Sequence, residues 1–362
     1  MVKKILVTAG SSGGHIFPAV SLVEGLRERD SQISVLLVLP KRSRNVCTVS
    51  SGIAVKYIST SVIKLRFSYQ NFKAIVDFIK GSFESLLILL KYRPDVVVGF
   101  GSIDSLPLVL FAWFFRKKTV LHEQNVVPGR ANRLLAKFVD KVAISFDKTR
   151  EYLDVNQQKI ILSGNPLRSS LKKIDRVVAL KFLGLDQDKL TILVMGGSQG
   201  SHRINECFLE AVSPLAGRFD IQVMHISGAN DADFLNSAYK KLNLRAKVVA
   251  FLDDMQYAYS VANLSVCRSG ATTVSELVFF KLPAVLVPFP FAYGHQQENA
   301  KGLEERGAGI IIEESALDAD SLRKVLVDLI NNPDKAQKMG RAYEKVSCGD
   351  ACNLLVDEVL KV

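Results

Sequence analysis

A histidine stands at the end of a glycine- and serine-rich stretch near the start of the chain. The stretch reads Thr8-Ala-Gly-Ser-Ser-Gly-Gly-His15 and follows a short apolar run. Glycines after a strand let the backbone approach a ligand, and the start of the following helix attracts anions. With an ordinary pKa of about 6.5, His15 can accept a proton at neutral pH. Two interpretations stay open, a general base beside an anion site or a loop histidine bonded to backbone.

A second glycine-rich stretch lies in the other half of the chain. Met195-Gly-Gly-Ser-Gln-Gly-Ser201, which contains Ser198, also follows an apolar run. Neither stretch is a GxGxxG or a GxxxxGK[ST], which counts against a nicotinamide dehydrogenase and a P-loop NTPase. Tight packing of strand on helix explains either stretch alone. Two stretches in matching positions predict a ligand crevice between two domains.

Hydroxyl groups and a carboxylate follow the apolar run at 264–267. Ser269 is the expected N-cap of a helix whose first turn holds Ala271, Thr272 and Thr273. The amides and hydroxyls of such a turn suit a diphosphate. Glu276 lies one turn further on the face of Thr272 and suits the hydroxyls of a sugar. A well-capped helix without any ligand would show the same residues. The functional interpretation therefore depends on the combination of strand, glycine, hydroxyls and glutamate.

Other polar residues predict further parts of a site. His122-Glu-Gln-Asn125 ends a strand, where four polar side chains are expected to line a site, and Arg168 can bind phosphate. Three Asp-x-Asp pairs lie in polar turns, and neither HExxH nor paired Cys/His spacing occurs, so no metal is predicted. The five cysteines are scattered and odd in number, which predicts reduced thiols.

Positive charge is concentrated in the first half. Up to Asn165 there are 24 Lys+Arg and 12 Asp+Glu, and from Pro166 onward 23 and 24. Basic residues beside exposed aromatics suit an anionic membrane surface or nucleic acid, whereas a buried helix end with solvated lysines is the alternative. No apolar run reaches the ~18–20 residues of a membrane span. The expected membrane face consists of Phe111, Trp113, Phe114, Phe115, Arg116, Lys117 and Lys118.

The elements that must position these groups are short apolar runs alternating with helix-period segments. Several runs are Val/Ile/Leu throughout, as in strands covered on both faces. The pattern predicts an α/β fold with two doubly wound parallel sheets. The expected domains are 1–165 and 166–333, followed by helices at 334–362 that are candidates to pack back on the first domain. Strands are predicted at 4–8, 34–39, 55–59, 95–99, 119–122, 141–144, 160–163, 191–195, 221–226, 246–250, 264–267, 284–287 and 309–312, and helices after the glycine-rich turns at 17–29 and 203–216.

Together and in order, the motifs resemble those of the bacterial MurG family, from about Lys4 to Asn332. Its members are peripheral-membrane N-acetylglucosaminyltransferases that convert lipid I to lipid II in peptidoglycan synthesis. The resemblance implies a GT-B fold, with two Rossmann-like domains facing a cleft, and neither metal nor cofactor. The matching motifs are Gly13-Gly-His15-Ile-Phe-Pro18, Gly99-Phe-Gly101, His122-Glu-Gln-Asn125, Gly164-Asn-Pro166, Gly196-Gly-Ser-Gln-Gly200, Phe251-Leu-Asp-Asp-Met255, Cys267-Arg-Ser-Gly270, Thr273-Val-Ser-Glu276 and His295-Gln296 with Asn299.

The resemblance also implies residue roles. His15 matches the general base, which takes the proton of the muramic acid 4-hydroxyl directly or through water. That oxygen attacks the anomeric carbon with inversion, and UDP leaves. Leu252 would meet the uracil, Glu276 the ribose and Gln296 the sugar hydroxyls. The residues matched to UDP-GlcNAc are Ser12, Gly13, Gly14, Asn125, Arg168, Ser198, Leu252, Ala271, Thr272, Thr273, Val274, Ser275, Glu276 and Gln296.

By the same resemblance, the acceptor is undecaprenyl-pyrophosphoryl-MurNAc-pentapeptide. The protein is expected at the cytoplasmic face of the inner membrane, without nucleic acid and with cell-wall assembly proteins as candidate partners. Three alternatives remain. They are transfer to another lipid such as a diacylglycerol, a UDP-GlcNAc 2-epimerase that would need carboxylates in the cleft, and a non-catalytic binder of anionic lipid or nucleic acid.

Two loops depart from the family pattern. The first loop of the family usually reads Gly-Gly-Thr-Gly-Gly-His, so Ser11 replaces a glycine here, while Ser12 keeps a hydroxyl. After Gly101 the family usually has Gly-Tyr, where this chain has Ser102-Ile103-Asp104. In the family this second loop faces the acceptor.

Overall fold

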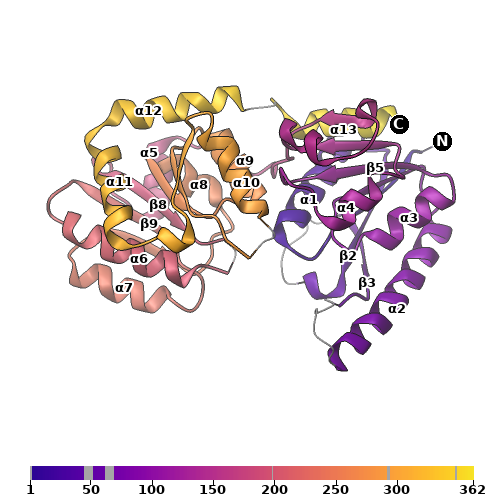
Figure 1. Cartoon of the computed structure of the whole chain (residues 1–362), viewed down its shortest axis with the longest axis horizontal. Helices are drawn as coiled ribbons and strands as arrows, with labels where there is room; N and C mark the ends of the chain where they lie inside the picture. The colour runs from indigo at the N-terminus through magenta and orange to yellow at the C-terminus, as the bar shows by residue number, and fades with distance from the viewer. Residues whose placement is uncertain (1, 45–51, 62–68, 198, 292–293, 347–348) are drawn as a thin grey trace. The chain divides into compact units, whose positions relative to one another are not determined.

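The computed structural model describes residues 2–44, 52–61, 69–197, 199–291, 294–346 and 349–362 (Figure 1). The chain forms two compact units. Unit 1 consists of Met1–Ser169 with Cys348–Val362, and unit 2 of Ser170–Ser347. The segment 334–362 is therefore divided between them.

The sheet of unit 1 has seven strands in the order β3-β2-β1-β4-β5-β6-β7, and every neighbouring pair is parallel. Parallel strands need crossover connections, which here are mostly helices. The strands are β1 (Lys4–Thr8), β2 (Ser34–Pro40), β3 (Ala54–Ile58), β4 (Val96–Gly99), β5 (Lys118–Glu123), β6 (Lys141–Ile144) and β7 (Ile160–Leu162). The helices are α1 (Gly13–Arg29), α2 (Tyr69–Tyr92), α3 (Leu106–Phe114), α4 (Arg130–Leu135) and α13 (Ala351–Lys361), with 3-10 turns η1 (Lys41–Ser43), η2 (Asp147–Tyr152) and η3 (Gln157–Lys159).

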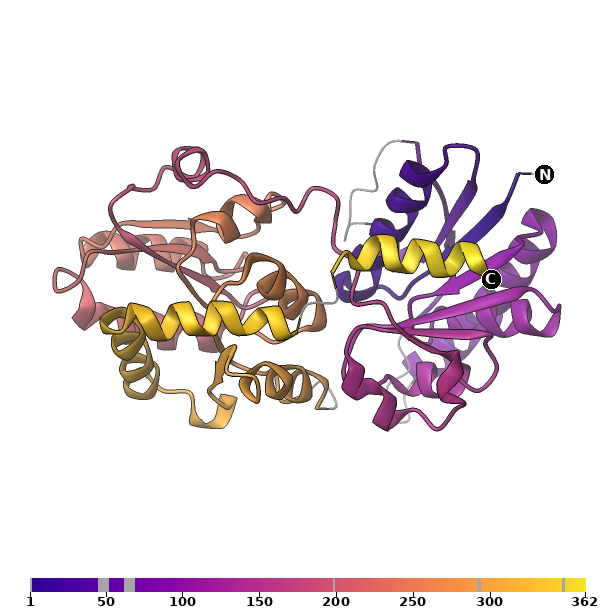
Figure 2. The same cartoon turned by 90° about the horizontal axis from the view of Figure 1, so that it is seen from above.

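Helices cover both faces of this sheet, which is why central strands such as β4 are apolar throughout. α1 and α13 pack on the face that carries Ile5 and Val7. α2, α3 and α4 pack on the face that carries Leu6 and Val97. α13, yellow in Figure 2, lies beside α1, and a Cβ added to Gly25 would lie 2.6 Å from Cys352 Sγ.

Unit 2 repeats this plan with six parallel strands in the order β10-β9-β8-β11-β12-β13. Apolar side chains of α6, α7 and α11 pack with the strands in one core. The strands are β8 (Leu190–Met195), β9 (Ile221–Ile226), β10 (Ala246–Val249), β11 (Leu264–Cys267), β12 (Ala284–Leu286) and β13 (Gly309–Ile311). The helices are α5 (Arg176–Leu183), α6 (His202–Val212), α7 (Ala232–Lys241), α8 (Met255–Val261), α9 (Ala271–Phe280), α10 (His295–Glu304), α11 (Ala319–Asn331) and α12 (Pro333–Ala342), with 3-10 turns η4 (Ser213–Leu215), η5 (Glu314–Ala316) and η6 (Tyr343–Lys345).

The α/β fold with two doubly wound parallel sheets is confirmed, and each predicted strand is present within one or two residues of its predicted ends. The helix boundaries differ more. α1 begins at Gly13, not at Phe17, because Ser12 is the extended N-cap residue and its carbonyl accepts from the His15 and Ile16 N–H groups at 3.0 Å. The helix predicted to reach residue 216 ends at Val212 and continues as η4.

Candidate functional site

In unit 1 the candidate base lies in the first turn of α1, at the carboxyl edge of the sheet. Ser12 Oγ and His15 Nδ1 are 2.7 Å apart, and the imidazole is half-buried. In the tautomer whose Nδ1–H donates to Ser12, Nε2 is the basic atom. The backbone N–H groups of Gly13 and Gly14 belong to the same turn, where a helix offers donors to an anion.

Arg168 lies beside this helix start. Its guanidinium carbon is 4.7 Å from the centre of the Phe17 ring. A Cβ on Gly13 would come within 2.9 Å of the same ring, so Gly13 makes room for Phe17. The first turn of α1 and the Arg168 guanidinium thus form one positively polarised region of unit 1, which suits an anionic ligand.

The sequence predicted that all four side chains of His122–Asn125 line a site, but three of them do not. His122, Glu123 and Gln124 are buried, and Asn125 alone is half-buried. His122 Nε2 donates to the Gly164 carbonyl at 2.9 Å, while Nδ1 accepts from Gln124 at 3.0 Å. Burial lowers the pKa of His122 to about 4, so the ring is neutral and ties β5 to Gly164.

Glu123 is a buried carboxylate that organises the loop after β5. It accepts hydrogen bonds from the Asn125 N–H at 2.9 Å, the Gly129 N–H at 3.1 Å and Asn132 Nδ2 at 2.7 Å. Burial raises the pKa of Glu123 despite these bonds. The Asn125 side chain is held by the same carboxylate at 3.3 Å, so Glu123 sets the position of the predicted donor contact.

In unit 2 the predicted anion site is the first turn of α9, but its N-cap is Gly270 and not Ser269. The Ser269 hydroxyl instead donates to the Gln296 carbonyl at 2.8 Å, which joins this turn to α10. Thr272 Oγ1 is buried and has no hydrogen-bond partner among the described residues. A buried hydroxyl without a partner is unusual, and this one lies in the turn predicted to bind the anion.

Further along α9, Glu276 is 6% exposed and accepts a hydrogen bond from the Tyr259 hydroxyl at 2.7 Å. No motif predicted Tyr259, because it comes from α8 and meets Glu276 only in three dimensions. Val274 is buried in the core, and the Ser275 hydroxyl donates to the Ala271 carbonyl at 2.9 Å. Both side chains therefore already make contacts within the protein.

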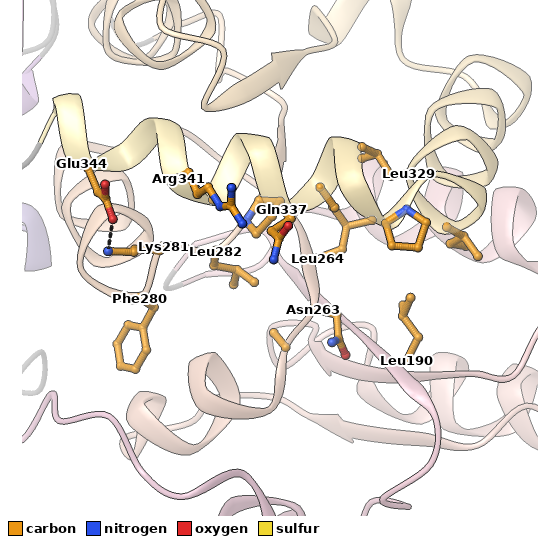
Figure 3. Close-up of a pocket in the computed structure, with 16 residues that line it drawn as sticks. Leu190, Asn263, Leu264, Phe280, Lys281, Leu282, Leu329, Gln337, Arg341 and Glu344 are labelled. Carbon is orange, nitrogen blue, oxygen red and sulfur yellow. Dashed lines mark hydrogen bonds and ion pairs between the residues drawn. The ribbon is translucent and has the colours of Figure 1, made fainter.

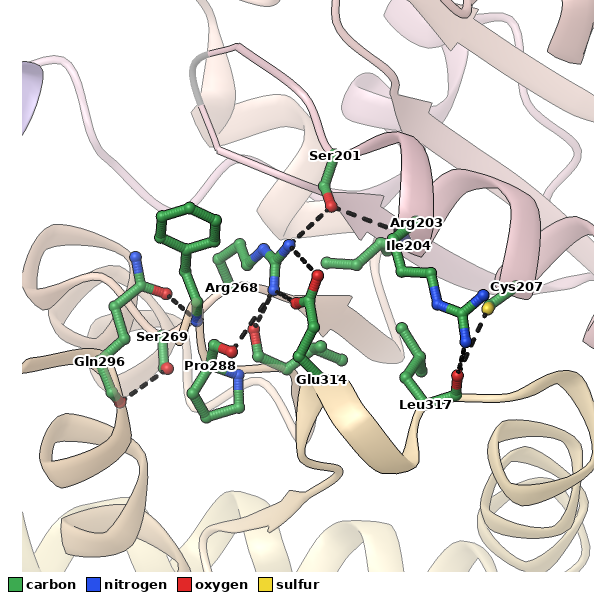
Figure 4. A network of polar contacts seen from close by, with 12 residues as sticks. Ser201, Arg203, Ile204, Cys207, Arg268, Ser269, Pro288, Gln296, Glu314 and Leu317 are labelled. Atoms are coloured by element: carbon green, nitrogen blue, oxygen red, sulfur yellow. Dashed lines mark hydrogen bonds and ion pairs between the residues drawn. The ribbon is translucent and has the colours of Figure 1, made fainter. Parts of the chain in front are cut away.

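Arg268 joins the loops around this turn, as Figure 4 shows. It is 7% exposed, pairs with Glu314, and donates to Ser201 Oγ at 2.8 Å and to the Val287 carbonyl at 3.2 Å. Its guanidinium carbon also lies 5.3 Å from the centre of the Phe289 ring. Arg268 thereby holds the segments that follow β8, β11, β12 and β13 in one arrangement. No motif indicates its pairing with Glu314, which is 46 residues away along the chain.

The remaining predicted donor residues lie on the loops of unit 2. The Phe289 N–H donates to Gln296 Oε1 at 3.0 Å, which fixes the orientation of that amide. Leu252 is half-buried between β10 and α8. Gly200 has φ +77°, and a Cβ there would lie 2.1 Å from the Ser227 carbonyl oxygen, so the glycine-rich turn needs this residue. Ser198 lies outside the described residues.

A surface that the sequence analysis missed lies on α2 in unit 1. A Cβ on Gly81 would be 2.0 Å from the Ser59 carbonyl oxygen, so the small-residue face of α2 packs closely inward. The opposite face presents a stripe of apolar side chains to solvent at the helical spacing that could have revealed it. This α2 stripe consists of Phe72, Ile75, Val76, Ile79, Phe83, Leu87 and Leu90.

The predicted membrane face on α3 is largely exposed. Of its four aromatic residues, Trp113, Phe114 and Phe115 are 44%, 70% and 41% exposed, and Phe111 is half-buried. Arg116 and Lys118 are exposed and Lys117 is half-buried. α3 packs against α2, so both apolar surfaces belong to one side of the unit 1 sheet.

Other features of the described residues lie away from these groups. A cavity of about 520 Å³ opens near the amino ends of β8 and β11, with the Lys281–Glu344 ion pair at its side (Figure 3). No predicted site residue lines it. Within the described ranges, no group of three metal-ligating side chains is found, and no helix is both long and apolar enough to cross a membrane.

The structure thus brings the predicted residues together in two separate groups. Ser12–His15, Asn125 and Arg168 belong to unit 1. Leu252, Ala271–Glu276 and Gln296 belong to unit 2.

Comparisons with known proteins cover the whole chain. The Glycosyltransferase family 28 N-terminal domain matches residues 5–144, and the Glycosyltransferase family 28 C-terminal domain matches residues 191–353. A UDP-N-acetylglucosamine--N-acetylmuramyl-(pentapeptide) pyrophosphoryl-undecaprenol N-acetylglucosamine transferase from Geobacter sulfurreducens is 35% identical, over 99% of this chain and 98% of the relative. A relative of the same name from Halothermothrix orenii is 34% identical, over 98% and 97%. The crystal structure of Acinetobacter baumannii MurG superposes with a TM-score of 0.79 at 25% identity, covering 99% of this chain and 100% of that one.

Proposed function

The chain belongs to the MurG family of glycosyltransferases, and from that premise we propose that it moves N-acetylglucosamine from UDP-GlcNAc to the muramic acid 4-hydroxyl of lipid I. Its fold is GT-B, and it is an N-acetylglucosaminyltransferase of peptidoglycan synthesis that forms lipid II. The observation that carries the residue assignment is the first turn of α9, where the buried Thr272 hydroxyl lacks a described partner beside Glu276.

Unit 2 is proposed to bind the donor. The amides and hydroxyls of Ala271–Thr273 would hold the diphosphate, and Glu276, oriented by Tyr259, would accept hydrogen bonds from the ribose. Gln296, whose Oε1 is taken by the Phe289 N–H, would offer Nε2 to the sugar hydroxyls. Leu252 would contact the uracil. Ser198 completes the set by resemblance alone, because it lies outside the described residues.

Unit 1 is proposed to carry the proton transfer. His15 Nε2 would take the proton from the muramic acid 4-hydroxyl, directly or through water, while Ser12 holds Nδ1 at 2.7 Å. The hydroxyl oxygen then attacks the anomeric carbon, the bond from that carbon to the diphosphate breaks, and inverted product and UDP result. Asn125, the amides of Gly13 and Gly14, and Arg168 would contact the donor from unit 1.

The leaving diphosphate gains negative charge as the bond breaks. Backbone amides at a helix start and a nearby guanidinium stabilise such charge without reorganisation. The turn of α9 and Arg168 supply these groups, and we propose that no metal ion is needed.

The α2 stripe and the α3 surface are proposed to dock on an anionic membrane. Exposed apolar side chains at helical spacing can enter the headgroup region, while Lys73, Lys80 and Arg116 attract anionic lipid. Docked in this way, the protein would be a peripheral enzyme on the cytoplasmic face, where it could reach a lipid-linked acceptor. Cell-wall assembly proteins remain candidate partners by resemblance only.

The first test measures UDP release from UDP-GlcNAc, with and without a short-chain lipid I analogue and with EDTA. Release that depends on the analogue and survives EDTA is the expected result. Formation of UDP-ManNAc without any acceptor would favour the epimerase, and transfer to diacylglycerol alone would favour another lipid acceptor.

Flotation with vesicles tests the membrane surface. Phe83→Ser, which changes a side chain 61% exposed on α2, is expected to reduce binding to phosphatidylglycerol vesicles several-fold. Phe182→Ser is the matched control, because Phe182 is 55% exposed in unit 2. An equal loss for both variants would contradict a specific docking face on unit 1.

A further inference from the structure

A buried aspartate lies in the loop between β4 and α3, where the chain departs from its family. Asp104 is 2% exposed, and its two carboxylate oxygens accept hydrogen bonds from Arg42 Nη2 at 2.9 and 2.7 Å. Arg42 belongs to η1, which directly follows β2. The pair therefore joins two strand-end loops of unit 1 that are 62 residues apart along the chain.

Asp104 also supports an unfavourable backbone conformation. Ser102 has φ +73°, in the left-handed region that glycine adopts easily and other residues rarely adopt. The MurG family usually has glycine at this position. Ser102 Oγ donates to Asp104 Oδ2 at 3.1 Å, which fixes the serine in the turn. The carboxylate thus accepts hydrogen bonds from Ser102 on one side and Arg42 on the other.

Ser102 in turn contacts the loop that carries the proposed base. A Cβ added to Gly10 would lie 2.4 Å from Ser102 Cβ and 3.3 Å from His15 Nδ1. Gly10 is therefore enclosed between the serine side chain and the imidazole ring. Gly10 is buried and leaves little free space there, so a displacement of Ser102 would press on Gly10 beside the ring.

We propose that Arg42 and Asp104 are positioning residues for the transfer reaction. The ion pair holds Ser102 against Gly10 and thereby fixes the orientation of His15 toward the acceptor hydroxyl. This inference depends on the proposed function, in which His15 is the base. Since a displacement of about 1 Å can cost about 10²-fold in rate, the effect falls on kcat. Donor binding, assigned mainly to unit 2, is expected to change little.

Kinetics of Asp104→Asn, Arg42→Gln and the double variant test the pair. Each single variant is expected to lower kcat about 10- to 100-fold and to change the KM for UDP-GlcNAc by less than about twofold. The double variant is expected to be no slower than the slower single variant, because both substitutions remove the same interaction. Arg42→Lys, which keeps the charge, should recover part of the loss. Asp357→Asn is the control, because it breaks the exposed pair with Arg29 between α13 and α1 and should leave kcat within about twofold.

A wild-type kcat in Asp104→Asn would overturn the proposal. Losses that multiply in the double variant would also overturn it, since they would show that Arg42 and Asp104 act separately. Ser102→Gly tests the same link without altering the buried charge. Glycine adopts the left-handed conformation unaided, so Asp104→Asn should cost less in the Ser102→Gly background than in the wild type.

Histidine resonances give a readout that does not require turnover. The chain has five histidines, so ¹⁵N-histidine labelling gives a simple spectrum in which His15→Gln assigns the His15 signals. Asp104→Asn is expected to shift the His15 ring signals and to leave those of His202 and His225 in unit 2 unchanged. Unmoved His15 signals would overturn the positioning role even if the enzyme is active. If the wild type transfers nothing to lipid I, the proposed function fails, and the spectrum still decides whether the pair positions the ring.

Discussion

The two units each hold their strand-end loops with one buried ion pair, but opposite charges are buried. In unit 1 the Asp104 side chain is 1% exposed and its partner Arg42 is 29% exposed. In unit 2 the Arg268 side chain is 9% exposed and Glu314 is 24% exposed. The buried cation lies under the loops proposed to meet a diphosphate, and the buried anion lies near the proposed base, which becomes cationic on taking a proton. In each unit the buried charge is opposite to the charge that arrives or forms there.

This difference is informative because buried ion pairs are seldom the most stabilising choice. Removing two charges from water costs several kcal/mol per ion, and apolar replacements are often as stable. The sign and place of such a pair therefore point to a requirement other than stability. We infer that unit 1, besides its smaller set of donor contacts, is organised around proton transfer and unit 2 around anion binding, and the following changes test that division.

The largest expected effect is on turnover when the base of unit 1 is removed. His15→Ala should lower kcat about 10²- to 10⁴-fold and leave the KM for UDP-GlcNAc within about twofold. Steady-state UDP release with a lipid I analogue measures both parameters. If the variant keeps most of its turnover, His15 is not the general base, and proton transfer is not the role of unit 1.

The next effect concerns the buried cation of unit 2. Arg268→Met leaves Glu314 without its partner and three neighbouring segments without their common donor, so the free energy of unfolding should fall by about 3–5 kcal/mol. UDP affinity should fall at least about tenfold, because the loops that bind the diphosphate lose their arrangement. Urea unfolding and calorimetric titration with UDP measure these changes. The control Lys281→Met breaks an exposed pair and should leave the free energy of unfolding nearly unchanged, and a similar cost for both variants would contradict the special role of Arg268.

Acid should weaken both units through one buried histidine each. Burial lowers the pKa of His122 in unit 1 to about 4 and that of His225 in unit 2 to about 3. Below pH 6.5 the unfolded chain binds a proton that the folded unit does not, so stability falls as pH falls. The loss is about 2 kcal/mol per histidine at pH 5, and it ends near pH 4 for His122 and near pH 3 for His225.

Urea unfolding at pH 7 and pH 5 measures this loss. His225→Gln should remove the contribution of unit 2 and leave that of unit 1. An identical pH dependence in the wild type and the variant would show that His225 is not held in its neutral form by the folded unit.

The smallest expected effect is a loss of UDP affinity in unit 2 without a loss of stability. Thr272→Val removes a buried hydroxyl that has no described hydrogen-bond partner, so the free energy of unfolding should change little. Affinity for UDP should nevertheless fall about 5- to 10-fold, as one hydrogen bond to a charged group is lost. Thermal unfolding and titration with UDP distinguish the two effects. A loss of stability without a loss of affinity would show that this hydroxyl stabilises the folded protein and does not bind UDP.

The sheets and the donor turn were predictable because their signals are local. Apolar runs predicted the strands, and the glycine and hydroxyl residues before α9 predicted its first turn. The N-cap was wrong by one residue, because Ser269 and Gly270 both suit the cap and the contact of Ser269 with Gln296 decides between them. The α2 stripe has a local signal too, the helical spacing of its apolar residues.

The contacts that organise the loops were not predictable from local patterns. Arg42 and Asp104 are far apart along the chain, as are Arg268 and Glu314, and no spacing rule joins them. The polar stretch after β5 shows the same limit. His122 and Glu123 resemble exposed site residues in sequence. In the structure both are buried, and they are hydrogen-bonded to the Gly164 carbonyl and to Asn132. Only the folded chain supplies those partners.

The placement of α13 in unit 1 has a consequence for how the chain folds during synthesis. Leu355, Val356 and Val359 complete the apolar layer over α1, yet the ribosome makes them after all of Ser170–Ser347. At about 5–20 residues per second, that segment takes roughly 10–35 s to translate. Throughout this interval the partner surface on α1 stays uncovered, so the nascent first unit depends on chaperones or on its own marginal stability until its last helix arrives.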